Sequence, residues 1–113
     1  MALYVIELKT LAYMAHDAVM RETGGTVGVR YDADLERVAD LMGTARTIAH
    51  KHPFVDGNKR TGFIIYMLNR SDEISMEEIV LALKTGDEEG RVARVIDDII
   101  DEHIDWLVLL SDI

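Results

Sequence analysis

Apolar residues recur every three or four positions along most of this chain, and this spacing is typical of helices that bury one face. The pattern predicts helices over residues 5–19, 35–49, 75–84 and 91–110. A further segment, residues 63–68, is apolar on every face, as expected of a central helix surrounded by others. With a single proline and no sustained two-residue alternation, the sequence predicts one all-α domain, residues 1–113.

Glycines and capping residues set the expected limits of these helices. Gly24 and the glycine after it should end the first helix, and the stretch that follows, to residue 30, is expected to be an extended flap. Asp32 is placed to cap the next helix, in which Gly43 is a candidate break. Ser75 opens a capping box, with Gly86 as the stop of that helix.

The composition narrows the classes of function. The chain has no cysteine, which excludes disulfides and thiolate metal sites and fits a reducing cytoplasm. Its apolar runs are too short to span a bilayer, and no secretory signal is visible because Glu7 and Lys9 interrupt the apolar start. A net charge of −9 repels nucleic acid. The one dense basic cluster, Lys51 with residues 59–60, suits a small polyanion such as a nucleotide.

Residues 52–62 place charged, polar and glycine residues at the start of the central helix. Gly57 allows an unusual backbone angle, after which the amides of Gly57, Asn58 and Lys59 would lie unpaired at the first turn, where the helix dipole favours an anion. Lys59 and Arg60 add positive charge at the same place. The segment is therefore expected to bind phosphate.

Two more side chains of this segment supply a base and a metal ligand. Imidazole titrates near neutral pH, so His52 can accept the proton of a hydroxyl group. Asp56 offers a hard carboxylate oxygen for Mg²⁺, which carries nucleotide phosphates and needs only one or two protein carboxylates. The residues of this segment also have purely structural interpretations. His52 would then be an ordinary loop histidine and Asp56 a helix cap. Asn58 would be a turn residue and Arg60 a cation on the helix surface.

The same segment resembles the signature of the Fic/Doc family, which reads His-x-Phe-x-Asp/Glu-Gly-Asn-Gly/Lys-Arg. The matching residues are His52, Phe54, Asp56, Gly57, Asn58, Lys59 and Arg60. Residues 16–19 and 24–30 also resemble the first helix and the glycine-rich loop of Doc-type toxins. So many mixed constraints make the match specific, and Lys59 indicates the Doc branch.

The resemblance implies a compact Fic/Doc-type helical bundle with a short flap loop and a central buried helix after the motif. It assigns catalysis to His52, Asp56 and Lys59, nucleotide binding to Gly57, Asn58, Lys59 and Arg60, and the metal to Asp56. Fic nucleotidyl transferases carry glycine where this chain has Lys59. The lysine therefore implies a kinase that uses Mg²⁺ and transfers the γ-phosphate of ATP to a hydroxyl of a protein target.

By the same resemblance the target would be a translation factor such as elongation factor Tu, and a small antitoxin would hold the enzyme silent. Two alternatives stay open: a Fic-type protein AMP transferase, and a non-catalytic binding module with the same fold. The segment from Arg30 to His52 looks shorter than in typical Doc relatives, so a helix there is expected to be trimmed or merged.

A His-Asp pair and a pair of histidines suggest metal sites but fit them poorly. His16 and Asp17 resemble the pair of metal phosphohydrolases, yet no histidine precedes them, so a helix-packing role is favoured. His50 and His52 lack further aligned ligands for zinc.

Two segments near the end of the chain are ambiguous. Residues 85–90 match the inhibitory pattern Ser/Thr-x-x-x-Glu-Gly/Asn of some Fic proteins, in which the glutamate pairs with a second motif arginine. Phe63 occupies that position here, so a turn between helices is expected instead. Residues 106–110 fit either the core or a contact surface.

Overall fold

Helices make up most of residues 4–38 and 40–111, the part of the chain that the computed structural model describes. The α-helices are α1 (Val5–Thr23), α2 (Leu41–Lys51), α3 (Asn58–Arg70), α4 (Met76–Lys84), α5 (Arg91–Glu102) and α6 (Ile104–Leu110), and the 3₁₀ helix η1 (Asp32–Glu36) precedes α2. Within the described residues there is no strand, only one isolated β-bridge. The predicted all-α class is confirmed.

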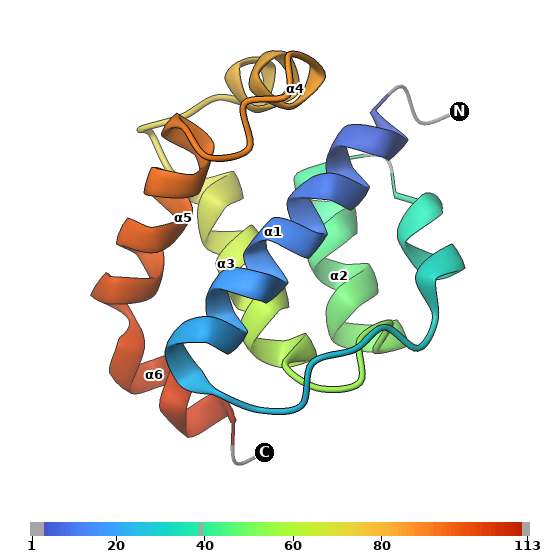
Figure 1. The fold of residues 1–113 in the computed structure, drawn as a ribbon, viewed down its shortest axis with the longest axis vertical. Coiled ribbons are helices and arrows are strands. Elements are labelled where there is room, and N and C mark those ends of the chain that lie inside the picture. The colour runs from blue at the N-terminus through green and yellow to red at the C-terminus, as the bar shows by residue number, and fades with distance from the viewer. Residues whose placement is uncertain (1–3, 39, 112–113) are drawn as a thin grey trace.

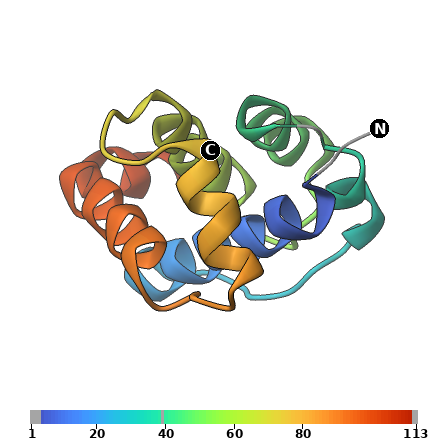
Figure 2. The same ribbon diagram turned by 90° about the horizontal axis from the view of Figure 1, so that it is seen from above.

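The central helix of the bundle is α3. Figure 1 shows α3 behind α1 and between α2 and α5, with α4 across the top and α6 near the end where α3 begins. Seen from above, α2 and α3 lie side by side on the same side of α1 (Figure 2). Ile64, Ile65 and Leu68 of α3 are buried, whereas Phe63 and Tyr66 are only partly buried. The predicted buried central helix is confirmed, with one face left less covered.

Local signals placed several helix ends correctly. The first helix, α1, ends at Gly24, which has φ 76° and donates its N–H to the carbonyl oxygen of Met20 at 2.8 Å. The hydroxyl oxygen of Ser75 accepts a hydrogen bond from the amide of Glu78 at 3.1 Å and so caps α4. Both features follow from residues a few positions apart, so the sequence was sufficient to predict them.

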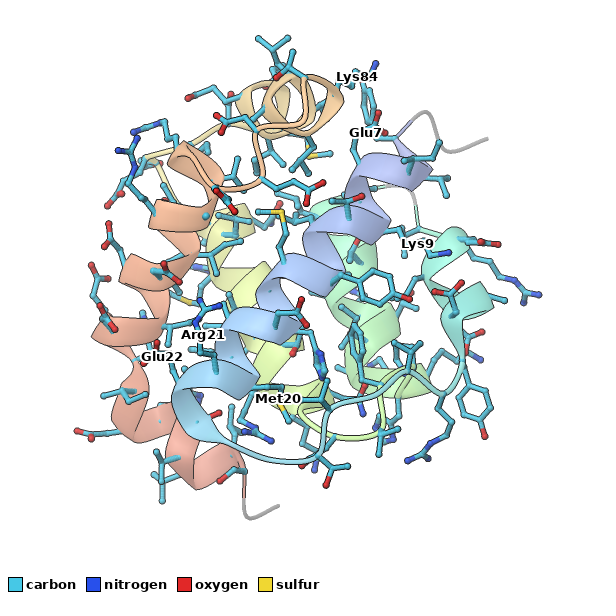
Figure 3. The ribbon with its side chains drawn as sticks, viewed as in Figure 1. Glu7, Lys9, Met20, Arg21, Glu22 and Lys84 are labelled. Atoms are coloured by element: carbon cyan, nitrogen blue, oxygen red, sulfur yellow. The ribbon has the colours of Figure 1, made fainter. Side chains whose placement is uncertain are left out.

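The segment before α2 differs from the prediction of a helix capped by Asp32. The Asp32 carboxylate instead accepts hydrogen bonds from Lys9 Nζ, at 2.6 Å, and from the hydroxyl of Tyr13, and these bonds join α1 to η1. Figure 3 shows the side chain of Lys9 extending from α1 toward η1. The true cap of α2 is Asp40, which accepts the amide of Gly43 at 2.6 Å. Gly43 therefore lies in the first turn of α2 and does not break it.

The prediction of one continuous helix over residues 91–110 is wrong, because the helix is interrupted at His103. The ring Nδ1–H of His103 donates to the carbonyl oxygen of Ile99 at 2.7 Å. The main-chain N–H of His103 bonds Ile100 at 3.1 Å instead. A side chain that occupies the carbonyl four residues back competes with the helical ladder, so α5 and α6 form separate helices.

The flap runs antiparallel to the motif loop, along the lower edge of the molecule in Figure 1. The N–H of Val55 donates to the carbonyl oxygen of Gly28 at 3.0 Å, and the N–H of Arg30 donates to that of Pro53 at 2.7 Å. The expectation of an extended flap over residues 25–30 is therefore confirmed, and the flap is attached to the motif through its main chain.

The helices pack into a compact bundle, with a Cα radius of gyration of 12.7 Å, close to the value of about 13 Å that folded chains of this length adopt. Among the described residues, no helix combines the length and the apolar character needed to cross a membrane.

Candidate functional site at the start of α3

A cavity of about 190 Å³ lies where α3 begins. It is lined by His52, Val55, Asp56, Gly57, Asn58, Lys59, Arg60, Leu110 and Ser111. The six residues that were assigned to the site from the sequence therefore all lie on one concave surface. The end of α6 adds a wall that the sequence pattern did not predict.

The motif loop is held in place by Phe54 and Asn58. Phe54 is fully buried, and its ring stacks on His16 with centroids 3.9 Å apart. The side-chain amide of Asn58 accepts the N–H of Phe54 at 3.0 Å and donates to the Phe54 carbonyl oxygen at 2.9 Å. The Asn58 side chain therefore holds the loop in place through the main chain of Phe54. The main-chain N–H of Asn58 lies in the first turn of α3.

Gly57 gives α3 its open start. It has φ 79°, in the left-handed region, and a Cβ added there would lie 2.5 Å from the sulfur of Met20, a residue labelled in Figure 3. No side chain caps this end, and within the described residues no acceptor bonds the amides of residues 58–60. The first amide of the helix with a partner is that of Thr61. Unpaired amides at a helix start favour an anion.

Asp56 is fixed by three hydrogen bonds. Its Oδ2 accepts the amide of Thr26 at 3.1 Å, and its Oδ1 accepts the amide of Gly57 at 2.8 Å and the guanidinium of Arg60 at 3.3 Å. These contacts, with the Thr26 amide the largest cause, lower the pKa of the Asp56 carboxyl below its ordinary value. The carboxylate is therefore ionised at neutral pH, in one orientation.

The donor set at Asp56 fits Mg²⁺ better than a metal enclosed by protein ligands. Among the described residues no group of three or more His, Asp or Glu side chains could hold a metal. Mg²⁺ keeps several waters and binds through one or two carboxylates plus substrate phosphates. A carboxylate offers about four lone-pair positions, and three on Asp56 are in use, so one is left for a cation.

Arg60 is buried, with 3% of its side chain exposed, contrary to the reading of a surface cation. One of its terminal nitrogens donates to the hydroxyl of Thr23 and, at 2.8 Å, to the carbonyl oxygen of Gly24, and the other donates to Asp56. A guanidinium has five N–H donors, and these three bonds leave two. Arg60 thus joins the end of α1 to the motif while it lines the cavity.

Of the six site residues assigned from the sequence, His52 and Lys59 are the exposed ones. His52 ends α2 with φ 52° and ψ 58°, the sole left-handed residue other than glycine in the described chain. Such a backbone costs on the order of 1 kcal/mol and is common at functional positions. Lys59 has no hydrogen-bond or ion-pair partner among the described residues, so its ammonium is available at the cavity.

His16 has a role in the site that the sequence did not predict. It is 2% exposed, and its Nε2–H donates to the main-chain carbonyl oxygen of Asp56 at 2.8 Å. Burial, the largest cause, lowers the pKa of His16 and keeps the ring neutral. Helix packing was predicted, but His16 also supports the motif loop from 40 residues away in the sequence, where no local pattern could indicate it.

We expect the fold to lose stability in mild acid because of His16. Its pKa is lower in the folded chain than the ordinary 6.5, so below that pH the unfolded state binds more protons. The free energy of unfolding should then decrease as the pH is lowered, by up to about 1.4 kcal/mol per pH unit. Urea titrations from pH 7.5 to 5.5 should show a steeper loss for the wild type than for His16→Asn. Equal slopes would contradict the prediction.

Of the two ambiguous segments near the end of the chain, residues 85–90 lie outside this site, and residues 106–110 reach it through Leu110. Residues 85–90 connect α4 to α5, and Glu89 lines a separate groove beside Asp17 and Arg21, so the expected turn is confirmed. Residues 106–110 contribute to both environments: Leu107 is fully buried, whereas Trp106 is 47% exposed.

Comparison with known proteins agrees with this geometry. Residues 9–69 match the model of the Fic/DOC family. The matched segment runs from α1, through the flap and α2, to the end of α3, and so contains the motif and every residue that fixes its loop. Searches of curated proteins and of solved structures gave no match. On the extent of the family match and the motif within it, the chain belongs to the Fic/DOC family.

Proposed function

We propose that this protein is a Doc-like kinase that transfers the γ-phosphate of ATP to a hydroxyl group of a protein target. Members of its family are typically transferases. The observation that carries the finer proposal is the position of Lys59, which lines the same cavity of about 190 Å³ as His52 and Asp56. A cation at the helix start stabilises charge on transferring phosphate oxygens.

The proposed reaction uses the residues around this cavity. The target oxygen attacks the γ-phosphorus, the bond from that phosphorus to the bridging oxygen breaks, and ADP leaves. His52 accepts the proton of the target hydroxyl. The main-chain amides at the start of α3, with Lys59 and the two remaining donors of Arg60, hold the phosphate oxygens.

Asp56 would hold Mg²⁺ through its remaining lone pair. When bound, the ion would neutralise part of the phosphate charge. Because Thr26 and Gly57 fix the carboxylate through their amides, the chain itself sets the direction in which the ligand oxygen points.

The resemblance to the Doc branch extends the proposal to the partners. We propose a translation factor such as elongation factor Tu as the target, a small antitoxin as the inhibitor, and the cytoplasm as the place of action. The absence of cysteine and the net charge of −9 are consistent with a cytoplasmic protein that does not bind nucleic acid.

A label-transfer experiment tests the proposal. The protein is incubated with Mg²⁺, elongation factor Tu or a cell extract, and ATP labelled on either the α- or the γ-phosphate. We expect target protein labelled from γ-labelled ATP alone, and no labelling when EDTA removes the metal. Label from the α-phosphate would instead assign AMP transfer. No label from either position, without nucleotide binding, would assign a binding module.

A further inference from the structure

A second, mostly apolar groove of about 330 Å³ lies beside the cavity, between α2, α3 and α6. It is lined by Met42, Ala45, Arg46, Ala49, His50, Lys59, Gly62, Phe63, Tyr66, Trp106 and Leu110. Lys59 and Leu110 line both the groove and the cavity at the start of α3. The two concave surfaces are therefore contiguous, and one ligand could occupy both.

The groove follows one face of α3. Gly62, Phe63 and Tyr66 follow Lys59 by three, four and seven positions, so these residues lie along a single face of the helix. At a rise of 1.5 Å per residue, the seven steps from Lys59 to Tyr66 span about 10 Å. This face thus has a cation at one end and aromatic rings further along, which suits an extended ligand with one anionic and one apolar end.

The groove has small residues on one side and aromatic rings on the other. A Cβ added at Gly62 would lie 3.2 Å from the carbonyl oxygen of Ala45, with Ala49 next to it, so α2 and α3 approach closely there. On the other side the rings of Phe63 and Trp106 have centroids 6.3 Å apart. Aromatic side chains of this kind stack on flat rings.

We propose that this groove binds the base of the nucleotide whose phosphates occupy the cavity at the start of α3. This inference rests on the proposed function and adds the position of the base to it. Phe63 places a neutral ring on this face, and a neutral ring does not attract phosphate groups. The phosphates should therefore stay near the positive charge of Lys59. His50 and Arg46 also line the groove, and their polar groups can bond the edge of a base.

Trp106 makes the proposal directly testable, because it is the single tryptophan of the chain. ATP and inorganic tripolyphosphate, each with Mg²⁺, are titrated into the unmodified protein. We expect both to bind by calorimetry, and ATP alone to change the fluorescence of Trp106. Equal fluorescence changes with the two ligands, or none with ATP although ATP binds, would overturn the placement of the base.

A substitution in the groove gives the second arm of the test. Trp106→Ser should weaken ATP binding about tenfold, the loss expected for one stacking contact, and leave tripolyphosphate binding unchanged. Leu81→Ser, which removes a 65% exposed apolar side chain from α4, is the matched control and should change neither affinity. If Trp106→Ser binds ATP as the wild type does, the groove has another occupant. If neither anion binds the wild type, the proposed function fails as well.

Discussion

Replacing His52 by alanine should lower the rate of phosphoryl transfer by about 10²- to 10⁴-fold, the usual contribution of a general base, while the protein stays folded. His52 lies on the surface at the end of α2 and its side chain packs into no core. Little structure should therefore depend on the ring. The measurement is the initial rate of label transfer from γ-labelled ATP, with circular dichroism to check the fold.

The variant His52→Gly separates the chemical role of this residue from its structural role. Glycine adopts the observed φ of 52° without strain, so the free energy of unfolding should rise by about 1 kcal/mol, although transfer is lost. A more stable and inactive protein would indicate that the histidine is there for chemistry. Wild-type transfer by both His52 variants would remove His52 from the mechanism.

The substitution Arg60→Met should give the largest loss of stability, on the order of 3 kcal/mol. It removes three hydrogen bonds from a buried guanidinium and leaves the hydroxyl of Thr23 and the carbonyl oxygen of Gly24 without their donor. The end of α1 and the motif loop would both loosen. Urea unfolding monitored by circular dichroism measures the change.

Lys59→Met is the matched control for Arg60→Met. Lys59 is exposed and has no hydrogen-bond or ion-pair partner among the described residues. The free energy of unfolding of the variant should therefore change by less than about 0.5 kcal/mol, even though transfer is expected to fall. Arg60→Lys keeps the charge but not the planar fork, and its stability should lie between those of the wild type and Arg60→Met. Identical unfolding curves for Arg60→Met and the wild type would show that the hydrogen bonds of Arg60 do not stabilise the fold.

The sequence predicted correctly those features that depend on neighbouring residues. The end of α1 at Gly24, the cap of α4 at Ser75 and the left-handed start of α3 at Gly57 all arise from residues within a few positions of one another. The motif also lies within one short segment, so six of the residues that line the cavity could be identified before the fold was known, whereas Leu110 and Ser111 at the end of α6 could not. The nucleotide-binding roles of these residues remain predictions.

The errors come from side chains whose partners lie elsewhere. Asp32 could cap a helix by its own local rules, but Lys9 and Tyr13 of α1 provide stronger partners, and Asp40 caps α2 instead. His103 lies within an unbroken apolar pattern, yet its ring takes the Ile99 carbonyl oxygen and divides the helix. The spacing of apolar residues indicates which face of a helix is buried. It does not indicate which of several polar groups will form a hydrogen bond with a given partner.

The sequence alone determined the helical class, the position of the central helix and the chemical character of the site, because apolar spacing, glycines and a compact motif are local properties. Only the tertiary structure decided how that site is held together. His16 reaches the carbonyl of Asp56 across 40 residues, and Arg60 reaches Thr23 across 37. Such contacts depend on how α1 packs against α3, and the groove beside Lys59 likewise exists only where α2, α3 and α6 meet.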